Sequence, residues 1–247
     1  MFIRNGKAAL RKVIGVLPRD ARLQIEYWLH PDRYSNLRET GGTHEHYDTL
    51  KCVFVHVPKS AGTSVRKTLF GNSLGGHKSV AFYKKMYGPI DYSKRFSFTF
   101  VRNPYSRIVS AFTYLKNGGM NSKDAQFAKE HLCDVNTFEE FVLEWLSFER
   151  RMAYEHFVPQ VDFVCDRGKI GVNFVGKFEN LDKDFDYIAR RLNLFDPSGA
   201  PIQLMHANST KRKRPVEAFY TPEIRNKISY LYREDFDTFK YDIYKFD

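Results

Sequence analysis

The sequence is poor in cysteine and has no long hydrophobic run. Its 247 residues contain three cysteines, Cys52, Cys133 and Cys165, and no CxxC pair. This pattern excludes a disulfide-stabilised scaffold and a cysteine-rich zinc module, and it fits a reducing compartment. No stretch approaches the roughly 20 consecutive apolar residues of a transmembrane helix, which excludes a membrane-spanning chain. The GxxxxGK[ST] loop is also absent, which disfavours an ATPase or a GTPase.

Acidic residues are outnumbered by basic ones. The chain has 29 Asp and Glu against 39 Lys and Arg, a net charge of +10. This balance indicates an anionic partner, such as nucleic acid, a membrane surface, a nucleotide or an acidic sugar polymer. Hydrophobic residues make up 43% and aromatic residues 16%, which is enough for a full core and excludes general disorder.

The chain shows no internal repeat and no low-complexity linker. We therefore expect a single domain over residues 1–247, with an N-terminal helix and loop appendage at 1–48 and an α/β core at 49–247. Residues 1–19 hold five basic residues and no acidic one. They predict a helix docked on the domain, with an amphipathic helix on an anionic membrane as the alternative. His44 and His46 lack a nearby third ligand, so we expect exposed loop histidines rather than a metal site.

Two strand–loop–helix units are the most ordered signal. Residues 51–57 are β-branched and aromatic, as in a strand buried on both faces, and turn after Pro58 into a helix at 64–70. A second such strand at 96–101 precedes Pro104, which suits the first turn of a helix reaching residue 116. Repeated units of this kind predict a mostly parallel central sheet flanked by helices. The other expected elements are helices at 121–131, 137–151 and 181–192, a strand at 173–178 and a last helix capped by Thr221 and Pro222.

Each of these units offers a loop that suits an anion. After the first strand, Lys59 adds an ammonium and Ser60, Thr63 and Ser64 add hydroxyl groups beside a helix N-terminus. By itself this is a phosphate cradle or an ordinary strand-to-helix turn. Arg102 follows the second strand, with Ser106 and Ser110 one helical turn apart. Since ligands bind at the carboxyl ends of parallel strands, both loops should open on one edge and suit a ligand with two separated phosphates.

The two loops together resemble those of sulfotransferases that use 3′-phosphoadenosine 5′-phosphosulfate (PAPS). Residues 56–64, HVPKSAGTS, resemble the 5′-phosphosulfate loop, and residues 100–112, FVRNPYSRIVSAF, the 3′-phosphate element. The resemblance is to the Golgi-type carbohydrate sulfotransferases, including the heparan 2-O and chondroitin enzymes, and to their bacterial relatives. Residues 156–160, 176–185 and 232–241 agree with it, so it runs from about residue 50 to the C-terminus.

The resemblance implies a P-loop-like three-layer α/β fold and transfer of a sulfuryl group from PAPS to a carbohydrate or glycoconjugate hydroxyl, without a metal. It places Lys59 at the 5′-phosphate and bridging oxygen. The phosphosulfate would be bound by the backbone of Ser60, Ala61, Gly62 and Thr63 and by the hydroxyls of Thr63 and Ser64. Arg102 and Ser110 would bind the 3′-phosphate.

The general base stays open between two histidines. His77 lies in a Gly-His segment between the two loops, similar to the one that carries the catalytic histidine in the heparan 2-O branch. His156 is the competitor, and Glu or Asp serves in other branches. A histidine suits the role because its pKa lies near neutral. His56 falls inside a buried strand, where we expect a hydrogen-bonded core histidine.

The basic run at 211–214 has three interpretations. In the first, Lys211 and Arg212 close over the bound nucleotide. In the second, the run binds an anionic sugar acceptor, and in the third it is a solvated basic loop without a ligand. Rival functions are a P-loop-type nucleotide kinase and a non-enzymatic binder of nucleic acid or polyanions. The kinase needs a Walker lysine, which the sequence lacks, and the binder does not explain two phosphate loops at strand ends. Animal relatives carry an N-terminal membrane helix, which does not follow Met1 here. We therefore expect a cytoplasmic enzyme of bacterial type that binds no nucleic acid, or a Golgi-lumen enzyme if the chain is part of a longer protein.

Overall fold

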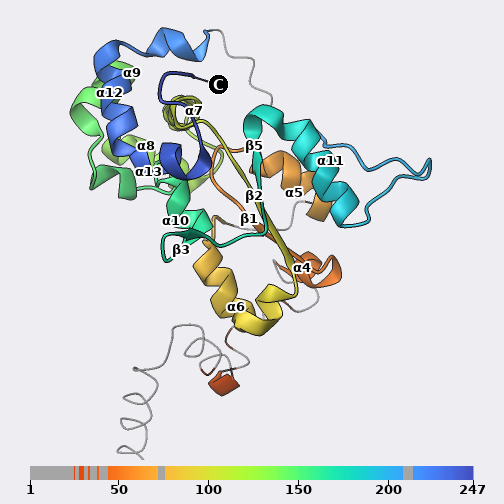
Figure 1. Cartoon of the computed structure of the whole chain (residues 1–247). Coiled ribbons are helices and arrows are strands. Elements are labelled where there is room, and N and C mark those ends of the chain that lie inside the picture. The colour runs from red at the N-terminus through yellow and green to blue at the C-terminus, as the bar shows by residue number, and fades with distance from the viewer. Residues whose placement is uncertain are drawn as a thin grey trace, which may run out of the picture.

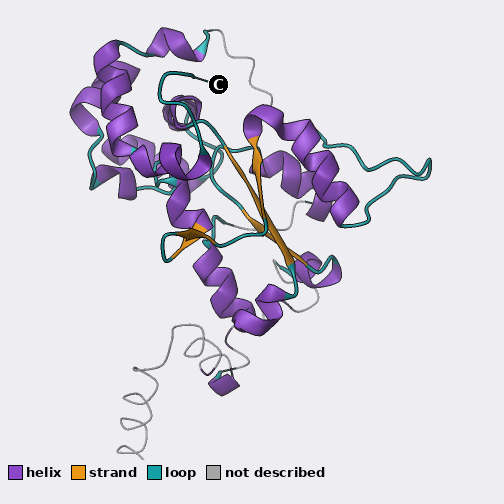
Figure 2. Cartoon of the chain, in the orientation of Figure 1, coloured by secondary structure: helices purple, strands orange, loops and turns teal. Residues whose placement is uncertain are grey.

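The computed structural model describes residues 44–71, 76–207 and 214–246, together with a few isolated residues between 25 and 38. Its centre is a parallel sheet of three strands in the order β1-β2-β5 (Figures 1 and 2). The strands are β1 (Cys52–Val55), β2 (Phe96–Val101) and β5 (Phe174–Lys177). Cys52 pairs with Phe96 and Val101 with Lys177, so the carboxyl ends of all three strands lie at one edge.

Helices cover both sides of this sheet (Figure 1). α5 (Gly62–Phe70) and α11 (Leu181–Arg191) lie on one side, and α7 (Pro104–Lys116) leads to a helical group on the other. The predicted α/β fold with a mostly parallel sheet between helices is confirmed. The remaining α-helices are α4 (Glu45–Thr49), α6 (Val80–Ser93), α8 (Ser122–His131), α9 (Phe138–Glu140), α10 (Gln160–Val164), α12 (Pro222–Leu231) and α13 (Arg233–Phe239). A small hairpin pairs β3 (Cys165–Asp166) with β4 (Lys169–Ile170).

Local sequence explains where the main helices begin. The Asn103 side chain accepts a hydrogen bond from the Tyr105 amide, with Pro104 in the first turn of α7. The Thr221 hydroxyl accepts one from the Ile224 amide in the same way, with Pro222 following. Such side chains satisfy backbone N–H groups that have no partner within the helix. Both starts were predicted from sequence, and both are confirmed.

The predicted helix at 137–151 is wrong in its second half. α9 passes into a π-helical turn at Phe141–Trp145, and Leu146 is extended. The Ser147 hydroxyl then accepts a hydrogen bond from the Arg150 amide and begins a short 3₁₀ turn, Arg150–Met152. A serine that bonds the backbone locally competes with helix continuation, and the apolar periodicity did not reveal this. α6 was not predicted at all; Gly88 (φ 72°) and Pro89 kink it.

The two N-terminal loop histidines do not behave alike. His44 is 2% exposed and packs against the rings of Tyr47 and Tyr83, whereas His46 is half-buried. The expectation of an exposed His44 is therefore wrong, because aromatic side chains of α4 and α6 enclose it. Burial lowers the pKa of His44 to about 4, so the ring is neutral at pH 7. The predicted N-terminal helix at 1–19 lies outside the described residues, and the boundary at 48/49 stays a prediction.

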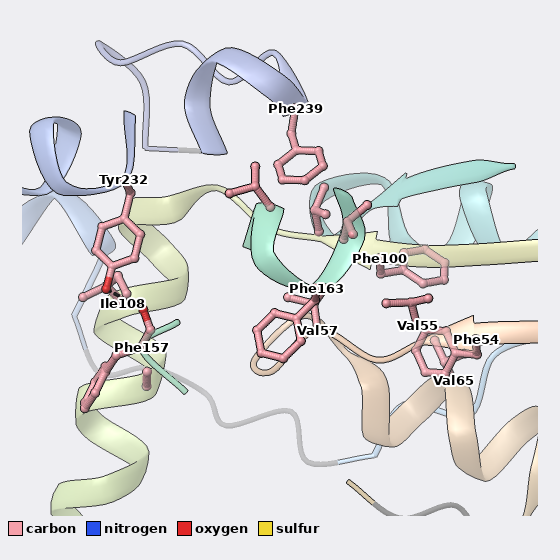
Figure 3. Close-up of a cluster of buried hydrophobic side chains, with 14 of the residues drawn as sticks. Phe54, Val55, Val57, Val65, Phe100, Ile108, Phe157, Phe163, Tyr232 and Phe239 are labelled. Atoms are coloured by element: carbon pink, nitrogen blue, oxygen red, sulfur yellow. Dashed lines mark hydrogen bonds between the residues drawn. The ribbon is translucent and has the colours of Figure 1, made fainter. Parts of the chain in front are cut away.

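The core joins the sheet to the helical group (Figure 3). Phe54, Val55 and Phe100 of the sheet are buried, as are Ile108 of α7 and Phe157. No helix in the described ranges is long and apolar enough to cross a membrane.

A fully buried arginine holds the segment before α10 in the core. Arg107 donates hydrogen bonds to the carbonyls of His156 (3.2 Å) and Val158 (2.9 Å) and lies 4.0 Å from Asp235. Asp235 in turn accepts hydrogen bonds from the amides of Gln160 (3.0 Å) and Val161 (2.9 Å). Residues 156–161 are thereby tied to α7 and α13, next to the carboxyl ends of the strands.

Candidate functional site

The loop after β1 has the geometry of an anion cradle. Lys59 (φ 67°) and Ala61 (φ 64°) both adopt left-handed backbone conformations before α5 begins at Gly62. Such alternation turns successive backbone N–H groups toward one point, next to the positive end of the helix dipole. Gly62 is required by space, because a β-carbon there would lie 1.8 Å from His56 Nε2.

The loop after β2 contacts the first loop directly. The Arg102 guanidinium donates from Nη1 to the Lys59 carbonyl (3.2 Å) and from Nε to the Ser106 hydroxyl (2.7 Å). Its central carbon, Cζ, lies 3.9 Å from the centre of the Phe178 ring. Because β1 and β2 are adjacent and parallel, residues predicted for the two ends of one ligand lie side by side at this edge.

A glutamine aligns the backbone between the loops. The Gln160 side chain accepts from the Arg102 amide and donates to the Arg102 carbonyl, both at 2.8 Å, and it also accepts from the Ser60 hydroxyl at 3.4 Å. Gln160 is fully buried. Gln160 belongs to the stretch 156–160 that agreed with the resemblance. Nothing in the sequence indicated that its side chain would bond to Arg102 and Ser60.

Lys59 points toward α7. Its ammonium lies 3.7 Å from the centre of the Tyr114 ring, an attractive cation–π arrangement. Ser106, Ser110 and Tyr114 recur every four residues on α7, which places them on one face. Ser110 is half-buried. Burial, and then the positive charge of Arg102, lower the pKa of Lys59 to about 8.

Two hydroxyls of the predicted phosphosulfate loop, those of Ser64 and Ser60, bond to other parts of the protein. The Ser64 hydroxyl accepts from the Ala207 amide (3.0 Å) and donates to the Ala207 carbonyl (3.3 Å). The Ser60 hydroxyl is the one that donates to Gln160, and Thr63 is half-buried. Ser64 thereby ties residues 196–207 to the first turn of α5. Lys211 and Arg212 lie outside the described residues, so their predicted role stays a prediction.

The structure brings three histidines together beside Lys59. The ring centres of His56 and His77 are 4.1 Å apart, and those of His77 and His156 are 5.7 Å apart. His77 Nδ1 lies 3.0 Å from the His56 carbonyl, and its Nε2 lies 3.6 Å from Glu155 Oε1. His156 Nε2 lies 3.3 Å from Asp124 Oδ1. The two candidate bases are therefore neighbours in one cluster.

Burial keeps these rings neutral. It lowers the pKa of His77 to about 4 and that of His156 to about 3, and it holds the pKa of His56 well below its ordinary value. A neutral imidazole has one nitrogen free to accept a proton, but these lowered pKa values make both rings weaker bases than the near-neutral histidine expected from the sequence. His56 is buried as expected, but its Nδ1 has no hydrogen-bond partner among the described residues, so the expected core hydrogen bond is missing at that atom.

Several residues of this cluster had no functional signal in the sequence. Tyr114, Asp124, Tyr154 and Glu155 all lie within the group around Lys59 and His77. Asp124 reads from sequence as an acid in the first turn of a helix, where it merely complements the dipole. In the described part of the chain, no group of three or more His, Cys, Asp or Glu side chains is arranged to hold a metal ion.

Comparison with known proteins identifies the family. No curated protein matches this sequence, and no solved structure matches it. The model of the Sulfotransferase family matches residues 47–242, which includes both anion loops, the histidine cluster and the C-terminal helices. The chain therefore belongs to the sulfotransferase family.

Proposed function

We propose that this sulfotransferase moves a sulfuryl group from PAPS to a hydroxyl of a carbohydrate or glycoconjugate. The observation that carries the proposal is the contact between the two anion loops, in which the Arg102 guanidinium donates to the Lys59 carbonyl. A donor with phosphates at both its 5′ and 3′ positions needs two such loops at one sheet edge.

The residues suggest a division of labour at the donor. The backbone N–H groups of Ser60–Thr63 would bind the phosphosulfate, and Lys59 the oxygen between phosphorus and sulfur. Arg102 and Ser110 would bind the 3′-phosphate. The acceptor oxygen forms a bond to sulfur while the bond from sulfur to the phosphate oxygen breaks, leaving adenosine 3′,5′-bisphosphate. Lys59 offsets the negative charge that grows on the leaving phosphate, in a site that holds the reactants in line.

The hydrogen-bond partners favour His77 over His156 as the base. A carbonyl can only accept, so the contact with the His56 carbonyl places the proton of neutral His77 on Nδ1 and leaves Nε2 free. His156 instead directs Nε2 at the Asp124 carboxylate, and its remaining nitrogen is buried without a partner among the described residues. His77 Nε2 would take the acceptor proton, next to Glu155, whose side chain is 46% exposed.

Calorimetric titration tests the donor site. Adenosine 3′,5′-bisphosphate and ADP would be titrated into the wild type, Arg102→Ala and Arg190→Ala. A hydrogen bond to a charged phosphate contributes about 1.5–3 kcal/mol, so Arg102→Ala should weaken bisphosphate binding by roughly ten- to a hundredfold. Arg190 is exposed and pairs with Asp186 on its own helix. Arg190→Ala therefore removes one positive charge outside the site, as a control for Arg102→Ala, and should bind the bisphosphate like the wild type. Equal or absent binding of both nucleotides would refute the donor site.

A transfer assay tests the base. The wild type, His77→Asn and His156→Asn would be given PAPS labelled in the sulfuryl group and a panel of neutral and anionic oligosaccharides. We expect His77→Asn to lose transfer while its affinity for the bisphosphate stays within about twofold. Retained transfer in His77→Asn, with loss in His156→Asn, would assign the base to His156 instead.

A further inference from the structure

A buried carboxylate lies behind Lys59 that the proposed reaction does not use. Asp124 is fully buried. It accepts hydrogen bonds from the hydroxyls of Tyr114 and Tyr154, both at 2.6 Å, and from the Met120 amide at 3.1 Å, and His156 Nε2 lies 3.3 Å away. Burial alone would raise the pKa of this carboxyl, but the hydrogen bonds from the two phenols and the amide outweigh it and lower the pKa. Asp124 is therefore an ionised group in the interior.

Tyr114 joins this carboxylate to the lysine. Its hydroxyl donates to Asp124 Oδ2, and its ring face lies 3.7 Å from the Lys59 ammonium. The hydrogen bond fixes the orientation of the ring, and the ring fixes where the ammonium rests. The negative charge of Asp124 also acts on Lys59 directly, raising its pKa against burial and against the charge of Arg102.

We propose that Asp124 is a positioning residue for sulfuryl transfer. Through Tyr114 it holds the Lys59 side chain at the phosphate loop. It also supplies the buried counter-charge of the Lys59 ammonium until the phosphates of the bound donor replace it. Without a counter-charge, the half-buried Lys59 loses its proton more readily, and a neutral amine neither binds phosphate nor neutralises a leaving group. Only the identity of the donor rests on the proposed function.

The titration of Lys59 can be distinguished from that of the charged and titratable groups around it. Arg102 faces it from the end of β2, Asp124 from α8, and the three histidines from the loops beside it. The histidines, with lowered pKa values, are neutral above pH 7. Phosphate monoesters are fully ionised above about pH 7 as well, since their second pKa is about 6. A step between pH 7 and 9.5 therefore reports on Lys59.

The first test needs no ligand. Trace labelling with acetic anhydride at a series of pH values, with the Lys59 peptide quantified by mass spectrometry, gives the pKa of that amine. We expect a midpoint near 8 in the wild type, a lower midpoint in Asp124→Asn and an unchanged one in Tyr154→Phe. Tyr154 is the matched control, because its hydroxyl bonds the same carboxylate at the same 2.6 Å distance, whereas it is the Tyr114 ring that the Lys59 ammonium lies over. Asp124→Ser is a second variant that removes the charge. Unlike asparagine, serine has no side-chain NH₂ group that could point at the Met120 N–H, which donates to Asp124 in the wild type.

The second test measures the consequence for binding. Adenosine 3′,5′-bisphosphate would be titrated into the same variants at pH 6.5 and pH 9. Each unit by which the Lys59 pKa falls should weaken binding at pH 9 by about tenfold and change it little at pH 6.5. Both pH values use the same folded protein, so a loss confined to pH 9 is not a loss of structure.

Three results would overturn the inference. The wild-type midpoint could lie at the ordinary value for lysine, near 10.4; the midpoint could stay unchanged in a folded Asp124 variant; or Tyr154→Phe could shift it as much as Asp124→Asn does. If the midpoints shift as expected but the wild type does not bind the bisphosphate, the role of Asp124 stands and the proposed donor is wrong.

Discussion

Adding a single methyl group at Gly62 should destabilise the protein because His56 already fills the space. A β-carbon at Gly62 would lie 1.8 Å from His56 Nε2, 1.9 Å from Cδ2 and 2.7 Å from Cε1. The imidazole cannot move away easily, since it stacks on Phe54 (5.6 Å between ring centres) and contacts His77. The backbone itself accepts alanine, because Gly62 begins α5 and is not among the residues with positive φ.

Two effects of opposite sign set the magnitude. Overpacking a filled core costs typically about 1–3 kcal/mol. Alanine is favoured over glycine in a helix by up to about 1 kcal/mol, which offsets part of that cost. We therefore expect Gly62→Ala to lower the free energy of unfolding by about 1–2 kcal/mol. In a His56→Ala background the clash is gone, so the same substitution should be neutral or stabilising by up to about 1 kcal/mol.

Urea unfolding followed by tryptophan fluorescence measures both effects. The wild type, the two single variants and the double variant form a double-mutant cycle, in which the midpoints give free energies if the urea slope stays constant. The sign of the Gly62→Ala effect should reverse between the two backgrounds. An unchanged midpoint in the single variant, or an equal cost in both backgrounds, would refute the close approach of the imidazole to this loop.

Three further predictions concern stability. Burial lowers the pKa of four histidines, so between pH 6.5 and about 4 the unfolded state binds more protons than the folded state. Stability is complete above pH 6.5 and should fall as the pH drops through this window; equal urea midpoints at pH 7.5 and 5.5 would contradict it. Asp235→Ala leaves the fully buried Arg107 without its carboxylate and should cost about 3–5 kcal/mol in thermal denaturation. The exposed Asp237→Ala should cost less than about 1 kcal/mol, and similar losses in both would be evidence against a buried pair. Thr221→Ala removes the N-cap of α12 and should cost about 1 kcal/mol in chemical unfolding; Thr221→Ser should recover most of it, and no recovery would mean that the hydroxyl is not the cap.

The sequence by itself determined the elements whose cause is local. The runs at 52–55 and 96–101 form strands because β-branched and aromatic residues fit a sheet buried on both faces. Asn103-Pro104 and Thr221-Pro222 start helices because capping and a preset φ act within four residues. Both anion loops lie at one edge of the sheet because the strands before them are parallel. Parallel strands can be predicted from the strand–loop–helix pattern of the sequence, so the position of the loops can be predicted as well. Local rules failed at 146–150, where the hydroxyl of one serine redirected the chain.

Tertiary structure alone decided which further polar groups surround Lys59 and Arg102. Asp124 meets Tyr154 across 30 residues, Gln160 meets Arg102 across 58, and Ser64 meets Ala207 across 143. The choice between His77 and His156 likewise depends on whether a carbonyl or a carboxylate faces each ring. Periodicity tells which face of an element is buried but not which distant segment covers it. Burial then sets the charge states, because the cost of desolvation exists only once the neighbours are in place.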